Sequence, residues 1–257
     1  MGLVFVKLGG SLITDKSRPY TALAEVIDRL AAEIHRARTA RPMPLLVGNG
    51  AGSFAHTTAA RHASHMGIEG SSWRGFAEVH HDALRLNVIV REALTRAGET
   101  AVTIQPSASC ITRHSRVASL AAEPIRRLLD AGVVPVVYGD VCVDDAQGCA
   151  IASTEEILRH LATVLRPERI IMAGKVEGVL DSSGRIVPEI TAESFHAIRA
   201  SLAPSDATDV TGGMLHKVER ALESGVPTEI LSGLVPGNLE RALMGETGLG
   251  TVVGRPS

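Results

Sequence analysis

The sequence has few aromatic residues, and its charges are nearly balanced. One Trp, two Tyr and four Phe occur among 257 residues, too few for platforms that stack nucleic-acid bases or for the aromatic belts of membrane proteins. Lys and Arg number 26 against 28 Asp and Glu, a formal net charge of -2, so no broad cationic face for a nucleic-acid backbone is expected. Apolar runs such as 133–138 are far shorter than a membrane span. We therefore expect neither nucleic acid nor a membrane as a partner.

Cysteine is also scarce. Cys110, Cys142 and Cys149 form no CxxC pair, and their odd number leaves one thiol over in any disulfide scheme. A reducing compartment and no zinc site are therefore expected. The start MGLVFVKLGG is interrupted by Lys7 where a signal peptide needs a longer apolar stretch and a cleavage site. These features indicate a cytoplasmic protein.

The motifs of several enzyme classes are missing. GxSxG, HExxH and the protein-kinase HRD and DFG patterns do not occur, and neither does a Walker A or a GxGxxG pattern. No side chain pattern points to a covalent nucleophile or to a metal ligand cluster. Chemistry that depends on such groups is therefore not expected.

Short apolar runs alternate with longer segments of helical period. Strands buried on both faces are predicted at residues 3–6, 45–47, 102–104, 133–137, 169–172 and 228–231. Helices are predicted at residues 22–38, 75–97, 118–131, 155–165 and 213–224. Turn residues at 144–148 and 181–184 predict two small β elements. This alternation predicts an α/β sandwich with a mainly parallel sheet, and the absence of repeats or long linkers predicts one domain over residues 1–257.

The first candidate site is the loop after the first predicted strand. Lys7 is followed by Gly9, Gly10 and Ser11, and Lys16 lies close behind. Glycines let backbone N–H groups approach an anion, and a lysine supplies a compact positive charge for phosphate oxygens. Lys7 also ends an apolar buried strand, where an unpaired ammonium is costly. The loop therefore predicts a polyphosphate site rather than a plain turn.

The second candidate is the segment 49–56, between a predicted strand and a helix that starts near Ser53. Small residues at a helix N-terminus form an anion site from free N–H groups and the helix dipole. His56, one turn into this helix, is expected to donate an imidazole N–H to a phosphate oxygen. The nine other histidines are expected to be structural or exposed.

Two further helix starts carry charged residues. On spacing alone, Glu155 and Glu156 are expected to compensate a helix dipole. Residues 211–213, Thr-Gly-Gly, precede a helix whose Lys217 points back toward its start, which indicates another anion cradle. Three glycine-bearing loops and three lysines without a nucleophile favour phosphoryl transfer, in which positioning and charge neutralisation do nearly all the catalysis.

The stretches 7–16, 49–56, 104–107, 134–141, 175–180, 209–217 and 250–253 resemble the amino acid kinase family, and within it most closely the isopentenyl phosphate kinases. The resemblance covers nearly the whole chain. It implies a three-layer αβα fold in which about 1–165 holds the phosphate acceptor and about 166–257 holds ATP. It further implies a homodimer that uses Mg²⁺ and ATP to convert isopentenyl phosphate, and dimethylallyl phosphate with it, to the diphosphate.

The resemblance assigns roles to residues of this chain. Lys7 and Lys16 would bridge the transferring phosphoryl group, and Glu155 would orient the catalytic lysines. The implied catalytic residues are Lys7, Lys16, His56, Glu155 and Lys217. The implied ATP-binding residues are Lys7, Gly9, Gly10, Ser11, Lys175, Gly178, Gly212, Gly213 and Lys217. The implied acceptor-binding residues are Gly50, Ala51, Gly52, Ser53, His56 and Thr154, with Phe76, Val79 and Ala83 walling the isoprenoid tail. No residue is assigned to a metal.

Three segments depart from the usual family pattern. Asn49 and Ala51 stand in a segment that is usually His-Gly-Gly-Gly, and Thr154 and Glu155 stand where the subfamily has Gly and Asp. Lys175 begins a segment that usually reads Asp-Val-Asp-Gly. The second departure lengthens the carboxylate expected to orient the lysines, and it bears on the identity of the acceptor.

Two alternatives remain open. One is a sister kinase for another small phosphate or phosphonate, such as the fosfomycin-type kinases; an Arg- and Asn-lined pocket would favour it, and an apolar pocket would favour an isoprenoid. The other is a non-catalytic anion-binding or storage protein on the same fold. The joint presence of Lys7, Lys16, His56 and Lys217 argues against storage, which needs no such charges.

Overall fold

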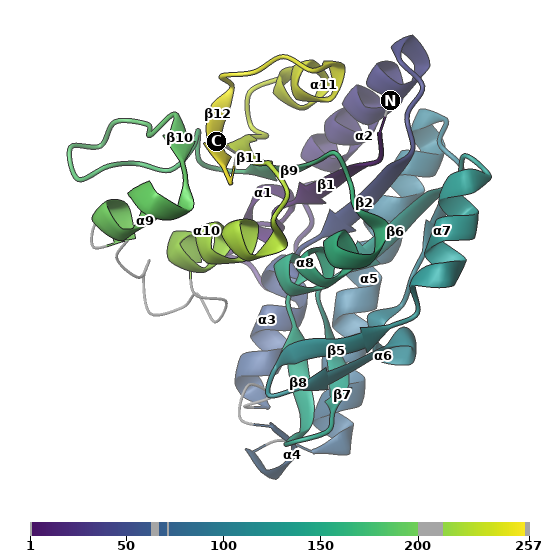
Figure 1. The fold of residues 1–257 in the computed structure, drawn as a ribbon. Helices are drawn as coiled ribbons and strands as arrows, with labels where there is room; N and C mark the ends of the chain where they lie inside the picture. The colour runs from purple at the N-terminus through teal and green to yellow at the C-terminus, as the bar shows by residue number, and fades with distance from the viewer. Residues whose placement is uncertain (1, 63–66, 71, 200–212, 255–257) are drawn as a thin grey trace.

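The computed structural model describes residues 2–62, 67–70, 72–199 and 213–254 and has an eight-stranded sheet at its centre (Figure 1). The strand order is β10-β12-β11-β9-β1-β2-β6-β3. These strands are β1 (Val4–Leu8), β2 (Leu45–Asn49), β3 (Ala101–Thr103), β6 (Val134–Tyr138), β9 (Arg169–Gly174), β10 (Glu189–Ile190), β11 (Thr228–Ser232) and β12 (Gly250–Val253). Neighbouring strands pair parallel except β11 with β12. The predicted mainly parallel sheet is therefore confirmed.

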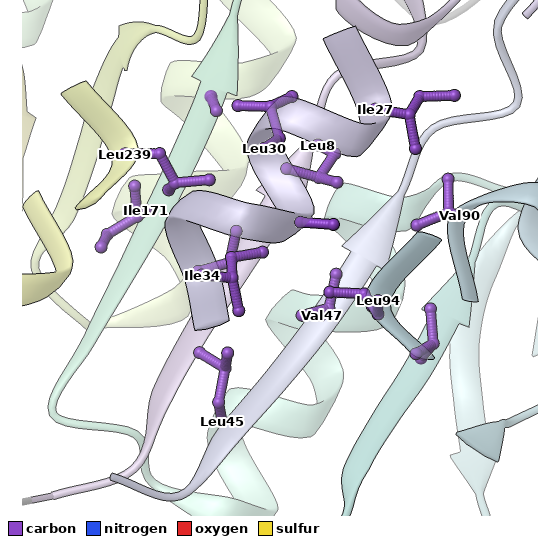
Figure 2. Packing of buried hydrophobic residues seen from close by; sticks show 14 of the residues in the cluster. Leu8, Ile27, Leu30, Ile34, Leu45, Val47, Val90, Leu94, Ile171 and Leu239 are labelled. Atoms are coloured by element: carbon purple, nitrogen blue, oxygen red, sulfur yellow. The ribbon is translucent and has the colours of Figure 1, made fainter. Parts of the chain in front are cut away.

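Helices cover both faces of the sheet, because successive strand residues point to opposite sides. In β1, Val4, Val6 and Leu8 pack into one core, whereas Phe5 packs into the other. Figure 2 shows part of the first core, which lies against α2 (Ala24–Ala40), α5 (Trp73–Ala97) and α11 (Asn238–Met244). The second core lies against α7 (Ala122–Asp130), α8 (Thr154–Leu165), α9 (Ala192–Ile198) and α10 (Gly213–Ser224). The predicted three-layer αβα sandwich is confirmed.

A second, four-stranded sheet projects from the main one (Figure 1). Its order is β5 (Arg116–Leu120), β4 (Cys110–Arg113), β7 (Asp140–Asp144) and β8 (Gly148–Ala152). The predicted turn at 144–148 joins β7 to β8, and Asp144 pairs with Gly148. The turn at 181–184 is also present, flanked by an antiparallel bridge between Leu180 and Ile186. Short helices complete the described chain: α1 (Gly10–Ile13), α3 (Gly52–Arg61), α4 (Gly67–Gly70) and α6 (Pro106–Ser109).

Two sequence-based expectations about elements are wrong. The helix predicted at 118–131 starts only at Ala122, because Arg116–Leu120 form strand β5, paired antiparallel with β4. Strand pairing thus overrides a local pattern that also fits a helix. Strand β3 is not buried on both faces: it is the last strand of its sheet, and Val102 is 38% exposed. Among the residues whose placement is described, no helix is both long and apolar enough to cross a membrane.

A buried carboxylate ties α2 to the start of α11. Glu33 of α2 accepts hydrogen bonds from Gly237 N at 3.0 Å and Leu239 N at 3.2 Å, and it also pairs with Arg29. The carboxylate itself is fully buried, and it satisfies two N–H groups of a helix start and one partly exposed guanidinium. Its removal would leave all three groups without this acceptor.

We expect Glu33→Ala to lower the free energy of unfolding by about 2–4 kcal/mol, because it removes the acceptor of the buried Leu239 N and the part-buried Gly237 N and one of the two partners of Arg29. Urea unfolding at pH 7 measures this loss. The matched control is Glu25→Ala on the same helix, where the exposed side chain should cost less than about 1 kcal/mol. Equal losses in the two variants would show that the Glu33 contacts contribute nothing special.

Candidate active site

A cavity opens at the carboxyl ends of β1, β2, β6 and β9, where loops leave the sheet for the helices. Carboxyl ends of parallel strands meet at one edge, so loops far apart in the sequence converge there. The sequence-predicted residues that line this cavity are Lys7, Gly9, Gly10, Ser11, Lys16, Gly50, Ala51, Gly52, His56, Val79, Thr154, Glu155, Lys175 and Lys217. The structure therefore brings most of the candidate residues into one place.

An ion pair between Lys7 and Glu155 lies at the centre of the cavity wall. Lys7 Nζ donates to Glu155 Oε1, and the two side chains are only 6% and 9% exposed. Glu155 sits in the first turn of α8, whose start is capped by Ser153 Oγ accepting from Glu156 N at 3.1 Å. Lys7 is thus a buried lysine with a carboxylate counterion. The ion pair offsets the free-energy cost of burying the ammonium group in an apolar strand.

Glu155 serves two lysines at once. Burial alone would raise the pKa of Glu155, but the charge and hydrogen bond of Lys7 and the charge of Lys217 lower that pKa to about 2. The carboxylate is therefore ionised throughout the neutral pH range. The charges of Lys7 on β1 and Lys217 on α10, two residues 210 positions apart, thus both act on this carboxylate. Neither spacing nor helix position predicts this link.

The lowered pKa of Glu155 predicts an acid-dependent loss of stability. Because the folded-state pKa of about 2 lies below the ordinary value of 4.5, the stabilisation is complete above about pH 4.5 and disappears as the pH falls toward 2. We expect wild type to lose more unfolding free energy between pH 5 and pH 3 than Glu155→Gln does, as measured by urea unfolding. Other carboxylates titrate equally in both proteins, so parallel curves would contradict the linkage.

The first two glycine loops lie directly against each other. A Cβ on Gly10 would lie 2.5 Å from Gly52 N, and one on Gly50 would lie 2.7 Å from Gly10 N. Gly52 also has a φ of +53°, in the left-handed region that favours glycine. These glycines are thus required for loop contact, in addition to any approach to an anion. Because the loops touch, anions held by them would be neighbours.

Part of the cavity lining is apolar and belongs to one hydrophobic cluster. Ala55 and Ala59 of α3 form it together with Val79 of α5 and Ile151 of β8. Among the described residues, no arginine or asparagine lines the cavity. The predicted wall residues Phe76 and Ala83 belong to the hydrophobic cluster around Val79 but are not among the lining residues.

Several candidate residues lie outside the cavity lining. Ser53 is buried behind the loop, where Ser53 N donates to Thr14 Oγ1 at 3.0 Å and Ser53 Oγ has no hydrogen-bond partner among the described residues. Gly178 packs against β12, where a Cβ would lie 2.7 Å from Thr251 Oγ1. Gly213 starts α10 without lining the cavity, and Gly212 lies outside the described residues.

Asp140 is the principal lining residue that the sequence reasoning missed. Its buried carboxylate accepts from Val141 N at 2.9 Å and Ser107 N at 3.2 Å and lies 3.1 Å from His80 Nδ1. The hydrogen bond that His80 Nδ1 donates to the Asp140 carboxylate raises the pKa of His80, although burial opposes it. The available signal was that Asp140 lies two positions after the end of β6, because functional groups gather at strand carboxyl ends. Other missed lining residues are Ala55, Ala59, Gly139, Ile151, Ser153, Met172, Ala173, Gly174, Val176, Met214 and Ile230.

The departures at Asn49 and Thr154 pack against each other. Thr154 Oγ1 donates to Asn49 O at 2.7 Å, and Asn49 Oδ1 accepts from Asn87 Nδ2 at 2.8 Å. Asn49 is buried and does not line the cavity, so its side chain joins β2 to α5 instead.

Among the described residues, no group of three or more His, Cys, Asp and Glu side chains could hold a metal ion.

The comparisons with known proteins agree with this arrangement. Residues 2–226 match the model of the amino acid kinase family. The chain is similar to isopentenyl phosphate kinase of Methanothermobacter thermautotrophicus, at 35% identity across 97% of this chain and 98% of that protein. It is similar to isopentenyl phosphate kinase of Haloferax volcanii at 35% identity, across 98% and 99% of the two chains. An X-ray structure of isopentenyl phosphate kinase superposes with a TM-score of 0.83 at 32% identity and covers 98% of this chain and 100% of that one. With this match over most of its length, the chain belongs to the amino acid kinase family.

Proposed function

We propose that the protein transfers the γ-phosphoryl group of ATP to isopentenyl phosphate, and also to dimethylallyl phosphate, to form the diphosphate. The observation that carries the proposal is the direct contact between the two glycine loops beside the Lys7–Glu155 pair. A donor phosphate on one loop and an acceptor phosphate on the other would face each other across a lysine-lined gap. The names of the relatives and the apolar wall of Ala55, Ala59, Val79 and Ile151 support an isoprenoid acceptor.

The proposed reaction is a direct in-line displacement. An acceptor phosphate oxygen forms a bond to the γ-phosphorus of ATP while the bond to the β,γ-bridging oxygen breaks, and ADP leaves. Lys7 and Lys16 would neutralise the charge on the transferring group, and Lys217 would contact the nucleotide phosphates. His56 would donate an N–H to the acceptor phosphate from α3. The acceptor oxygen already carries negative charge, so no general base is required.

ATP and Mg²⁺ are the proposed donor and cofactor. Mg²⁺ at nucleotide sites usually keeps several waters and binds phosphate oxygens rather than a protein cage. The cavity fits this mode, because its carboxylates are already engaged, Glu155 by Lys7 and Asp140 by His80. When bound with ATP, Mg²⁺ neutralises phosphate charge. We further propose that about 1–165 binds the acceptor, that about 166–257 binds ATP, and that the protein acts as a cytoplasmic homodimer.

An ATP-consumption assay with isopentenyl phosphate, dimethylallyl phosphate and fosfomycin in parallel tests the proposal, with products identified by mass. We expect rapid formation of the isoprenoid diphosphates. Activity with fosfomycin alone would move the protein to a phosphonate-kinase function and overturn the isoprenoid assignment. No ATP consumption with any of the three acceptors would contradict the proposed reaction.

A further inference from the structure

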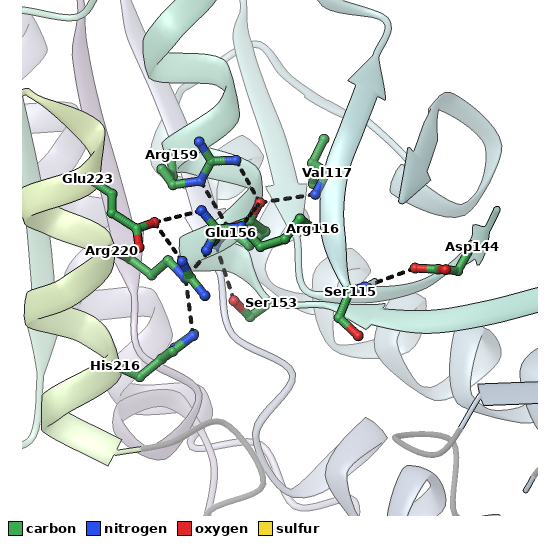
Figure 3. Close-up of polar contacts among 10 residues, drawn as sticks. All are labelled: Ser115, Arg116, Val117, Asp144, Ser153, Glu156, Arg159, His216, Arg220 and Glu223. Carbon is green, nitrogen blue, oxygen red and sulfur yellow. Dashed lines mark hydrogen bonds and ion pairs between the residues drawn. The ribbon is translucent and has the colours of Figure 1, made fainter. Parts of the chain in front are cut away.

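Glu156 follows Glu155 in the first turn of α8 and lies at the centre of a second charge cluster (Figure 3). Its side chain is 4% exposed and contacts three arginines, Arg159 at 2.7 Å, Arg220 at 3.5 Å and Arg116 at 3.6 Å. Glu156 Oε1 also accepts from Val117 N at 3.0 Å. These contacts join three elements, because the arginines come from α8, α10 and β5.

We propose that Glu156 and Arg220 form a positioning pair that sets α10, and with it Lys217, at the correct place beside Glu155. The inference rests on the proposed kinase function, in which Lys217 contacts the nucleotide phosphates. It gives the two consecutive carboxylates of α8 distinct tasks. Glu155 interacts with lysines inside the cavity, whereas Glu156 anchors the helix that carries one of them.

The geometry of the two helices supports this pairing. Lys217 and Arg220 are three residues apart on α10 and therefore lie on the same side of it. Consecutive residues of a helix point about 100° apart, so Glu155 and Glu156 can face different neighbours from one turn. α8 and α10 pack against each other. The pair therefore ties α8 to α10 within one turn of Lys217.

Glu156 is a fixed anchor rather than a mobile surface acid. The bond from Val117 N holds its carboxylate from β5, without any help from α10 or from Arg159. Arg220 is held in turn: its side chain is 15% exposed, Nη1 contacts Glu223 Oε2 at 2.5 Å, and Nε donates to His216 Nε2 at 3.1 Å. A fixed carboxylate facing a fixed guanidinium restricts where α10 can sit, as a surface ion pair does not.

The test is nucleotide binding by the whole protein, measured by isothermal calorimetry with Mg-ATP. We expect Arg220→Gln and Glu156→Gln each to raise the Kd about fivefold to twentyfold, and Arg220→Lys to restore part of the affinity. The matched control is Arg159→Gln, which removes a guanidinium from the same carboxylate but leaves the link to α10. Its Kd should stay within about twofold of wild type.

The same measurements in a Lys217→Ala background separate a positioning role from a general effect on stability. If Arg220 acts through Lys217, Arg220→Gln should add little to the Kd once Lys217 is already replaced by alanine. An equal penalty in both backgrounds, or equal Kd values for Arg220→Gln and Arg159→Gln, would overturn the proposal. Should Arg220→Gln fail to fold, as judged by circular dichroism, Arg220→Lys in both backgrounds decides the same question. No acceptor is present in this experiment, so failure of isopentenyl phosphate as a substrate remains a separate result.

Discussion

Lys7→Met is expected to lower kcat/KM with isopentenyl phosphate about 10²- to 10³-fold, the largest effect of any single change considered. A preorganised charge at a transferring phosphoryl group typically contributes a rate factor of about this size. The variant also removes the hydrogen-bonded partner of Glu155 and leaves only the charge of Lys217 to compensate this carboxylate. A buried negative charge would then face the phosphates that the cavity is proposed to hold. Steady-state kinetics with Mg-ATP measures the loss.

A double variant distinguishes chemistry from folding in this result. Lys7→Met combined with Glu155→Gln removes both charges of the ion pair, so the buried charge no longer lacks a partner. We expect the double variant to recover part of the unfolding free energy that the single variant loses, while its kcat/KM stays low. Recovery of activity together with stability would mean that Lys7 only maintains the fold. Retention of near wild-type kcat/KM by Lys7→Met would reject its role in transfer.

His56→Ala is expected to lower kcat/KM for the phosphate acceptor about 10²-fold while the Kd for Mg-ATP changes less than about twofold. His56 lines the cavity from α3, beside the loop of Gly50, Ala51 and Gly52. A hydrogen bond from the site to a charged phosphate is worth about 1.5–3 kcal/mol. The loss should therefore appear with the acceptor and not with the nucleotide.

His56→Gln supplies the matched control, because glutamine retains an N–H donor without the imidazole ring. We expect this variant to keep more acceptor use than His56→Ala does. Parallel losses in acceptor use and ATP binding would contradict a specific contact with the acceptor phosphate. Calorimetry for Mg-ATP and initial rates over a range of isopentenyl phosphate concentrations provide both readouts.

Secondary structure was predicted correctly where the hydrophobic pattern of a segment fits only a helix or only a strand. Gly213–Ser224 coincides with the helix predicted there, and the buried strands 45–47 and 228–231 lie within β2 and β11. The helix predicted at 118–131 is wrong in its first residues, because Ala118 and Leu120 fit a helix as well as a strand. Only the pairing with β4 makes this segment a strand. Strand pairing is a contact at a distance, which a local pattern does not contain.

For the candidate site residues too, local patterns predict less than contacts between distant residues reveal. On spacing alone, Glu155 is expected only to compensate a helix dipole. The resemblance alone implies that it orients the catalytic lysines. Its contact with Lys7, 148 residues away, and the nearby charge of Lys217 make it a counterion of two cavity lysines. Gly10 was expected to admit an anion, yet the contact with Gly52 is what excludes a side chain there.

By itself, the sequence determined the alternation of buried strands and helices, the placement of glycine loops at strand carboxyl ends, and the need of Lys7 for a negatively charged neighbour. These follow from hydrophobic period, backbone sterics and the cost of burying a charge, all of which act within a few residues. Only the tertiary structure decided that Glu155 forms an ion pair with Lys7, that Asp140 and Ala59 line the cavity, and that Glu156 contacts Arg220. Those pairings depend on how distant segments pack, and packing is a property of the whole chain.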